Sequence, residues 1–92
     1  MDENILKIDL KDELDLHVFH PGDIKPLLRE FIDNAKAKGI KRIRIVHGKG
    51  KSVQKSIVIS ELKKNRDIAE FHDEPGNWGA TIAYVAVDDN KM

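Results

Sequence analysis

The sequence contains no cysteine, so disulfide bonds, catalysis by a thiolate and zinc sites built from cysteines are all excluded. Four histidines are left as the only side chains that titrate near neutral pH or bind soft metal ions. The chain also lacks any run of about 18 apolar residues, and its first residues, MDENILKIDL, are acidic and unlike a signal peptide. We therefore expect a cytoplasmic protein that does not enter a membrane.

The chain is long enough for one small hydrophobic core and too short for two. It has 92 residues, of which 40% are apolar, and it shows no repeat, low-complexity tract or internal linker. We expect an N-terminal extension over residues 1–12, a single domain over residues 13–88 and a flexible tail over residues 89–92.

A formal net charge of zero conceals an uneven distribution of charge along the chain. Residues 36–66, called the basic block below, carry eleven Lys or Arg against a single acidic residue, whereas the segments on both sides are acidic. Clustered positive charge creates a field that the net charge does not report, so the basic block predicts contact with nucleic-acid phosphates. Solvated lysines that only cover helix ends and a strand are the alternative interpretation.

Apolar residues alternate with polar ones in two segments that we interpret as strands. In ELDLHV, Leu14 and Leu16 lie on one face, and Asp15 and His17 lie on the other. KRIRIV, residues 41–46, repeats this alternation. Ile43 and Ile45 lie opposite Arg42 and Arg44, so the two arginines reach a ligand only if their face of the sheet is open.

Two helices are predicted from apolar residues at helical spacing. The first spans Ile24–Lys38, with Asp23 as its N-cap and Gly39 as the residue that ends it. The second spans Ser52–Asn65 and depends on an imperfect apolar stripe that includes Val53.

The C-terminal third predicts two further strands. IAEFH is a short strand, DEPGNWG is a turn, and ATIAYVAV is a strand that is apolar on both faces, so Ile82 and Tyr84 belong to the centre of a sheet. ILKIDL, near the N-terminus, either adds an edge strand or wraps the surface. The order β-α-β-α-β-β predicts an α/β fold of the α+β two-layer sandwich type, with a mixed sheet of about four strands and two helices.

The segment RIRIVHGKGK, residues 42–51, ends in two glycines separated by lysine. It is neither a P-loop nor a dinucleotide fingerprint, because the glycines required five positions before and three positions after Gly50 are absent. Gly48 and Gly50 still allow close approach of a ligand, Lys49 and Lys51 supply positive charge, and the following helix N-terminus favours an anion. Anion binding is therefore predicted here in preference to an ordinary turn.

Parallel pairing of the first two strands would bring several polar residues to one edge of the sheet. In a right-handed β-α-β unit the carboxyl ends of both strands lie at the same edge, where open sheets usually bind ligands. We therefore predict that Asp15, His17, His47 and the loop at residues 48–50 converge on one rim.

At these residues the chain resembles the small MutS-related, or Smr, domain family. The resemblance rests on LDLH at residues 14–17, VHGKG at residues 46–50 and GATIAYV at residues 79–85, and it covers residues 14–87. It implies a two-layer fold like the C-terminal domain of a bacterial translation initiation factor, and an endonuclease that nicks DNA or cleaves RNA. The family motifs imply functional roles for Asp15, His17, His47, Gly48 and Gly50. Two departures from the family pattern are Val18, where glycine is common, and Trp78, where a small residue is common.

Three functions are compatible with these features. In a nuclease, Asp15 orients a histidine that relays protons, and the loop with Lys49 neutralises the scissile phosphate; in one variant Asp15 and a histidine hold Mg²⁺ or Mn²⁺. A domain that only binds structured or branched DNA or RNA is the second function, and a protein-interaction module is the third. The residues predicted to contact phosphate are Arg42, Arg44, Gly48, Lys49, Gly50 and Lys51, and Trp78 either caps the core or stacks on an unpaired base.

Overall fold

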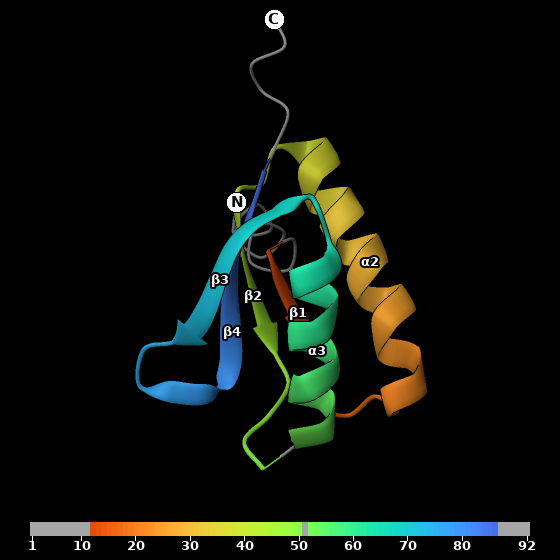
Figure 1. Ribbon diagram of the computed structural model, residues 1–92, viewed down its shortest axis with the longest axis vertical. Coiled ribbons are helices and arrows are strands. Elements are labelled where there is room, and N and C mark those ends of the chain that lie inside the picture. The colour runs from red at the N-terminus through yellow and green to blue at the C-terminus, as the bar shows by residue number, and fades with distance from the viewer. Residues whose placement is uncertain (1–11, 51, 87–92) are drawn as a thin grey trace, which may run out of the picture.

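The computed structural model describes residues 12–50 and 52–86 (Figure 1). In chain order the elements are β1 (Glu13–Asp15), α2 (Pro21–Lys38), β2 (Arg42–Val46), α3 (Ser52–Lys64), β3 (Ile68–Glu74) and β4 (Asn77–Val85). The strands form one sheet in the order β1-β2-β4-β3, in which β1 runs parallel to β2 and the other pairs are antiparallel. The predicted mixed four-stranded sheet with two helices is confirmed. The ILKIDL segment and residues 89–92 lie outside the described residues.

Both helices pack on one face of the sheet, and the core lies between these two layers (Figure 1). The core is built from side chains that alternate along the strands and recur at helical spacing along α2. Its buried members include Leu16, Ile43, Ile45, Ala83 and Val85 from the sheet side, and Ile24, Leu28, Ile32, Val58 and Leu62 from the helices. None of the described helices is long and apolar enough to cross a membrane.

Helix α2 begins three residues earlier than the sequence predicted. His20 is the N-cap residue but its side chain makes no capping hydrogen bond, and Pro21 occupies the first turn, where its fixed φ suits a helix. Asp23 therefore does not cap the helix; it lies in the first turn, where its negative charge interacts favourably with the helix dipole. Pro26 falls in the second turn, at the cost of one backbone hydrogen bond. The end of the helix at Gly39, with φ 76°, is confirmed.

Helix α3 is confirmed, but its buried face differs from the predicted one. Val53 is 56% exposed, so its assignment to the apolar stripe was wrong. The face turned toward the core includes Gln54 and Glu61 together with Val58 and Leu62. The Glu61 carboxylate accepts a hydrogen bond of 2.8 Å from the Nε–H of Arg29 in α2, which compensates for the burial of its charge. Two buried polar residues explain why the apolar pattern of this helix is irregular.

Strands β3 and β4 form a hairpin that is tighter than predicted. Of the predicted turn DEPGNWG, only Pro75 and Gly76 lie outside the two strands, and Gly76 has φ 76°. Proline at the first turn position, followed by a glycine with positive φ, is the pattern of a type II turn. As predicted, β4 is central, and Ile82 is fully buried.

Candidate functional site

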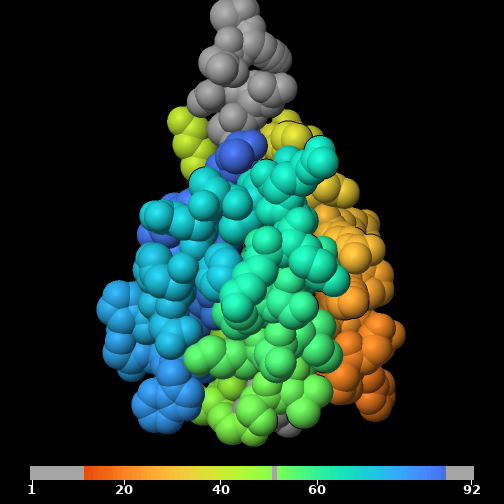
Figure 2. Space-filling view, viewed as in Figure 1, coloured from red at the N-terminus to blue at the C-terminus, as the bar shows by residue number. Residues whose placement is uncertain are grey.

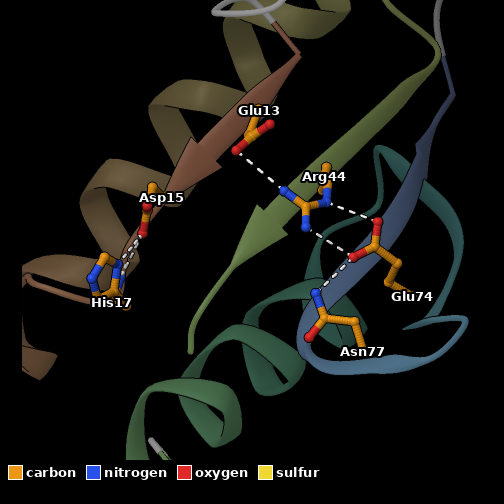
Figure 3. Close-up of polar contacts among 6 residues, drawn as sticks. All are labelled: Glu13, Asp15, His17, Arg44, Glu74 and Asn77. Carbon is orange, nitrogen blue, oxygen red and sulfur yellow. Dashed lines mark hydrogen bonds and ion pairs between the residues drawn. The ribbon is translucent and has the colours of Figure 1, made fainter. Parts of the chain in front are cut away.

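Asp15 and His17 form a hydrogen-bonded pair at the carboxyl end of β1 (Figure 3). One oxygen of Asp15, Oδ1, accepts a bond of 2.5 Å from Nδ1 of the His17 ring and another of 3.1 Å from the His17 backbone N–H. The bond from His17 lowers the pKa of Asp15, and partial burial opposes this effect only in part. Because an ionised carboxylate can only accept, Nδ1 carries a proton, and in the neutral ring Nε2 presents its lone pair. Within the described part of the chain, Nε2 has no hydrogen-bond partner.

Both side chains of this pair are accessible to solvent. The side chain of His17 is 47% exposed and that of Asp15 is 51% exposed. The backbone N–H of the intervening Leu16 bonds to the carbonyl of Val46 at 2.7 Å, which holds the pair beside the end of β2. A ligand at this edge of the sheet can therefore reach Nε2 of His17.

The side chain of His47 does not share this rim, which corrects the prediction that both histidines converge there. His47 continues the inward-facing positions of β2 and is fully buried. Its Nε2 lies 2.9 Å from Oγ1 of Thr81, and its Nδ1 has no hydrogen-bond partner among the described residues. Burial lowers the pKa of His47, so the ring is neutral at pH 7.

The glycine-rich loop is attached to the start of β4. The N–H groups of His47 and Gly48 donate to the same carbonyl, that of Gly79, at 3.0 and 2.8 Å. Two residues facing one is the arrangement of a β-bulge, which bends the chain away from the sheet. A Cβ at Gly79 would lie 2.9 Å from both the backbone N and Cγ of Lys49, so no larger residue fits there without a shift. Gly48 and Gly50 have φ 92° and 76°, values that favour glycine.

A pocket of about 260 Å³ lies where this loop enters α3. Its lining residues are Gly48, Gly50, Ser52, Lys55 and Trp78. Ser52 is the first residue of α3, whose first N–H groups have no partner within the helix, and Lys55 adds a positive charge to the pocket; both features suit an anion. Lys55 also forms an exposed ion pair of 3.2 Å with Asp73, and such pairs are weak enough to exchange. Lys51, predicted to contact phosphate, lies outside the described residues.

Trp78 stands at the mouth of this pocket and does not cap the core. It is 58% exposed, and Nζ of Lys49 lies 4.6 Å from the centroid of its ring. Figure 2 shows the tip of the β3–β4 hairpin, in blue, beside the loop and the first turn of α3, in green, at the lower end of the molecule.

Arg44 makes its hydrogen bonds within the protein, on the face of the sheet away from the helices (Figure 3). Its Nε and Nη2 each donate to Glu74 at 2.9 Å, and its Nη1 lies 3.2 Å from Glu13. Glu74 in turn accepts from Nδ2 of Asn77, whose Oδ1 accepts from the N–H of Gly79. This chain of contacts connects β1, β2 and the hairpin, so Arg44 braces the site and its charge is neutralised by carboxylates.

The basic block is divided between the two ends of the molecule. Lys36 and Lys38 lie in the last turn of α2, and Lys63 and Lys64 lie in the last turn of α3, where positive charge interacts favourably with the helix dipole. Both of these helix ends lie at the upper end in Figure 1, opposite the loop. Arg42, at the start of β2, is also distant from the loop.

Near the loop, two members of the basic block remain among the described residues, Lys49 and Lys55. Within residues 12–50 and 52–86, no three His, Asp or Glu side chains are grouped as ligands for a metal ion. A divalent cation at the rim would therefore rely on Asp15 or His17 together with water and substrate oxygens.

Comparison with known proteins places these features in a sequence family. The model of the family described as "Smr domain" matches residues 14–86. Endonuclease MutS2 of Geobacillus sp. is 38% identical over 69 residues, which cover 75% of this chain and 9% of that protein. Endonuclease MutS2 of Carboxydothermus hydrogenoformans is 30% identical over 76 residues, covering 79% of this chain and 10% of that protein. The chain thus spans about a tenth of the length of these relatives.

Two solved structures share the fold. The Smr domain of Thermus thermophilus MutS2 superposes with a TM-score of 0.77 at 23% identity, covering 80% of this chain and 96% of that chain. YdaL, a stand-alone small MutS-related protein from Escherichia coli, gives a TM-score of 0.77 at 24% identity, covering 82% of this chain and 64% of that chain.

Proposed function

This chain belongs to the Smr domain family, and from that premise we propose that it binds nucleic acid and cleaves it as an endonuclease. The observation that carries the proposal is the Asp15–His17 pair, which is half exposed and presents a free Nε2 at the rim. The names of the MutS2 relatives, which are called endonucleases, agree with it. The substrate is DNA or structured RNA.

The proposed reaction is hydrolysis of a phosphodiester. The oxygen of a water molecule bonds to phosphorus while the bond to one ester oxygen breaks. Nε2 of His17 takes the proton of the attacking water, and the departing ester oxygen takes a proton from solvent. Asp15 holds the ring in the required tautomer and stabilises the imidazolium that forms. In a variant of this mechanism, Asp15 helps to hold Mg²⁺ or Mn²⁺, which would polarise the phosphate.

The phosphate is assigned to the pocket at the start of α3. Its backbone N–H groups, with Lys55 and the neighbouring Lys49, balance the negative charge that grows on the phosphate oxygens. Lys51 is also proposed to contact the phosphate, because of its place in the sequence next to Gly50. Arg44, which is bound by Glu74 and Glu13, is assigned to bracing the site.

His47 is assigned a positioning role in this proposal. Its ring packs beneath the loop and bonds to Thr81, while its backbone N–H joins that of Gly48 on Gly79. A neutral ring without solvent contact holds the loop in place and exchanges no protons with a substrate.

The second candidate function is binding of structured or branched nucleic acid without cleavage. The burial of His47 favours it, because only one histidine of the two motifs is then accessible as an acid or base. In that case His17, once Nε2 also carries a proton, donates a hydrogen bond to phosphate, and the Asp15–His17 pair contributes affinity instead of catalysis.

The deciding experiment measures cleavage and binding together. The purified protein is incubated with supercoiled plasmid and with structured RNA, with and without a chelator, and compared with His17→Ala and Asp15→Asn. If His17 transfers a proton, each replacement should slow cleavage by roughly 10² to 10⁴ and leave binding nearly unchanged, because proton transfer occurs only in the transition state. Asp33→Asn is the matched control, since Asp33 is an exposed carboxylate of α2 and belongs neither to the Asp15–His17 pair nor to the contacts of Arg44.

The outcomes separate the two candidates. Salt-sensitive binding without cleavage of either substrate would reject the endonuclease and leave the binding module. A loss of binding and cleavage together in His17→Ala would assign His17 to substrate contact. Cleavage that stops on chelation would move the mechanism to the variant with Mg²⁺ or Mn²⁺.

A further inference from the structure

Trp78 is an exposed aromatic side chain on a rigid support. It is the second residue of β4 and follows the turn at Pro75 and Gly76. The preceding Asn77 donates a hydrogen bond to Glu74 and accepts one from the N–H of Gly79. The Lys49 ammonium over its ring fixes the position of one ring face by a cation–π contact. An exposed ring of this size that is held in place loses little conformational freedom when a planar ligand stacks on it.

The indole ring borders two recesses of different charge. On one side lies the pocket with Lys55 and the loop glycines. A second recess, of about 330 Å³, is lined by residues 73–78. The Lys55 ammonium attracts a phosphate to the first recess, whereas no Lys or Arg lines the second recess.

We propose that Trp78 stacks on an unpaired base, while the phosphate of the same nucleotide lies in the pocket between the loop at residues 48–50 and Lys55. This inference rests on the proposed function and specifies its substrate class: nucleic acid with at least one unpaired nucleotide at the rim. A base inside a continuous duplex is stacked on both sides and has no face to offer, so a perfect duplex contacts the protein through phosphates only. Lys49 contributes to the binding of both the base and the phosphate, because its ammonium holds the Trp78 ring and adds positive charge beside the phosphate.

The tryptophan itself reports on this contact, because Trp78 is the only tryptophan of the chain. Fluorescence is titrated with a short single-stranded oligonucleotide, with a blunt duplex of the same sequence, and with an oligomer of equal phosphate number in which the bases are removed. The single strand should quench Trp78 strongly, and the duplex and the abasic oligomer should quench it weakly. Affinities for the same three probes are measured in parallel by anisotropy of a label on the nucleic acid.

Substitutions test whether the aromatic ring of Trp78 causes the preference for the single strand over the duplex. Trp78→Ala should lower affinity for the single strand by about 5- to 150-fold, the range expected for loss of one base–aromatic stack, and should leave duplex affinity nearly unchanged. Trp78→Phe should restore most of the lost affinity. Val53→Ala, which removes another exposed apolar side chain from the start of α3, should have no effect.

Each result supports or overturns the inference. Equal quenching by duplex and single strand, or equal losses with both probes in Trp78→Ala, would overturn base stacking while leaving phosphate binding intact. If Trp78→Ala retains full affinity for the single strand and the protein still cleaves, the inference fails and the proposed function stands. If the unmodified protein binds none of the probes, both fail.

Discussion

The two motif histidines have opposite surroundings. The side chain of His17 is half exposed and bonded to a carboxylate, whereas that of His47 is fully buried and bonded to a hydroxyl of Thr81. Burial disfavours the charged form of His47 and lowers its pKa; the backbone of Gly48 opposes this effect, the nearby Lys55 ammonium reinforces it, and the Asp73 carboxylate opposes it weakly. Protonation of His47 is therefore coupled to the stability of the fold.

This coupling predicts how stability depends on pH. The pKa of His47 is lower in the folded protein than its ordinary value of 6.5, so below that pH the unfolded chain binds a proton that the folded chain resists. The free energy of unfolding should be highest above about pH 6.5 and should decline as the pH falls toward the folded pKa. In His47→Gln this component should disappear, although the variant should be less stable at pH 7.5 by about 1–3 kcal/mol through lost hydrogen bonding. Urea unfolding of both proteins at several pH values measures how the free energy of unfolding depends on pH. The same dependence in both proteins would contradict the prediction.

Among the elements, the loop at residues 48–50 and the β3–β4 hairpin depend on each other. The carbonyl of Gly79 holds two N–H groups of the loop, and its missing side chain leaves room for Lys49. The Arg44–Glu74–Asn77 contacts hold the hairpin from the other side of the sheet. The position of the pocket is thus set by contacts between elements as much as by the loop itself.

Replacement of Gly79 should therefore disturb the loop. We expect Gly79→Ala to destabilise the protein by about 1–3 kcal/mol, because its Cβ would meet the backbone of Lys49 and force the loop outward. Gly22→Ala is the matched control: nothing lies within 4 Å of its added Cβ, and it is helical, so it should be neutral or stabilising by about 0.5–1 kcal/mol. Thermal unfolding compares the two variants, and equal effects would refute the steric account.

The order of elements, the central β4 and the Asp15–His17 pair could be predicted from the sequence because each depends on local spacing. The inward direction of the His47 side chain also follows from the alternation that includes Ile45. The sequence prediction placed it at the rim instead, because it stands at the end of a strand. The pairing of Arg44 with Glu74 could not be predicted, because it depends on strand order that brings together residues 30 positions apart. Lys55 was missed because it belongs to no motif and reaches the pocket only through the geometry of α3.

For the molecule as a whole, the positions of the basic residues matter more for phosphate binding than their number. The helix C-termini gather lysines at one end, where they complement the helix dipoles, and the pocket has its own smaller group at the other end. Only the second group lies at the end of the sheet where β1 and β2 end, which is also the end that carries Asp15 and His17. Counting charges along the sequence cannot separate the two groups.

Salt dependence of nucleic-acid binding distinguishes these groups. Affinity should fall as salt rises, because phosphate contacts release bound counterions. Lys49→Ala should reduce the slope of log affinity against log salt by roughly one, whereas Lys64→Ala, at the end of α3, should leave it unchanged. Equal reductions in both variants would show that the contact surface extends over the whole basic block, and binding that ignores salt would favour a protein-interaction module.

The directions of the first and last strands, β1 and β4, also determine how this fold can be joined to other polypeptides. The start of β1 pairs with the middle of β2, and the end of β4 lies beside the start of β2, so residues 12 and 86 leave the sheet away from the edge that carries Asp15, His17 and the loop. Both points at which further polypeptide joins the described fold therefore lie at strand ends opposite the rim. Such an arrangement makes the fold a transferable module, able to keep the same rim open to solvent in chains of very different length.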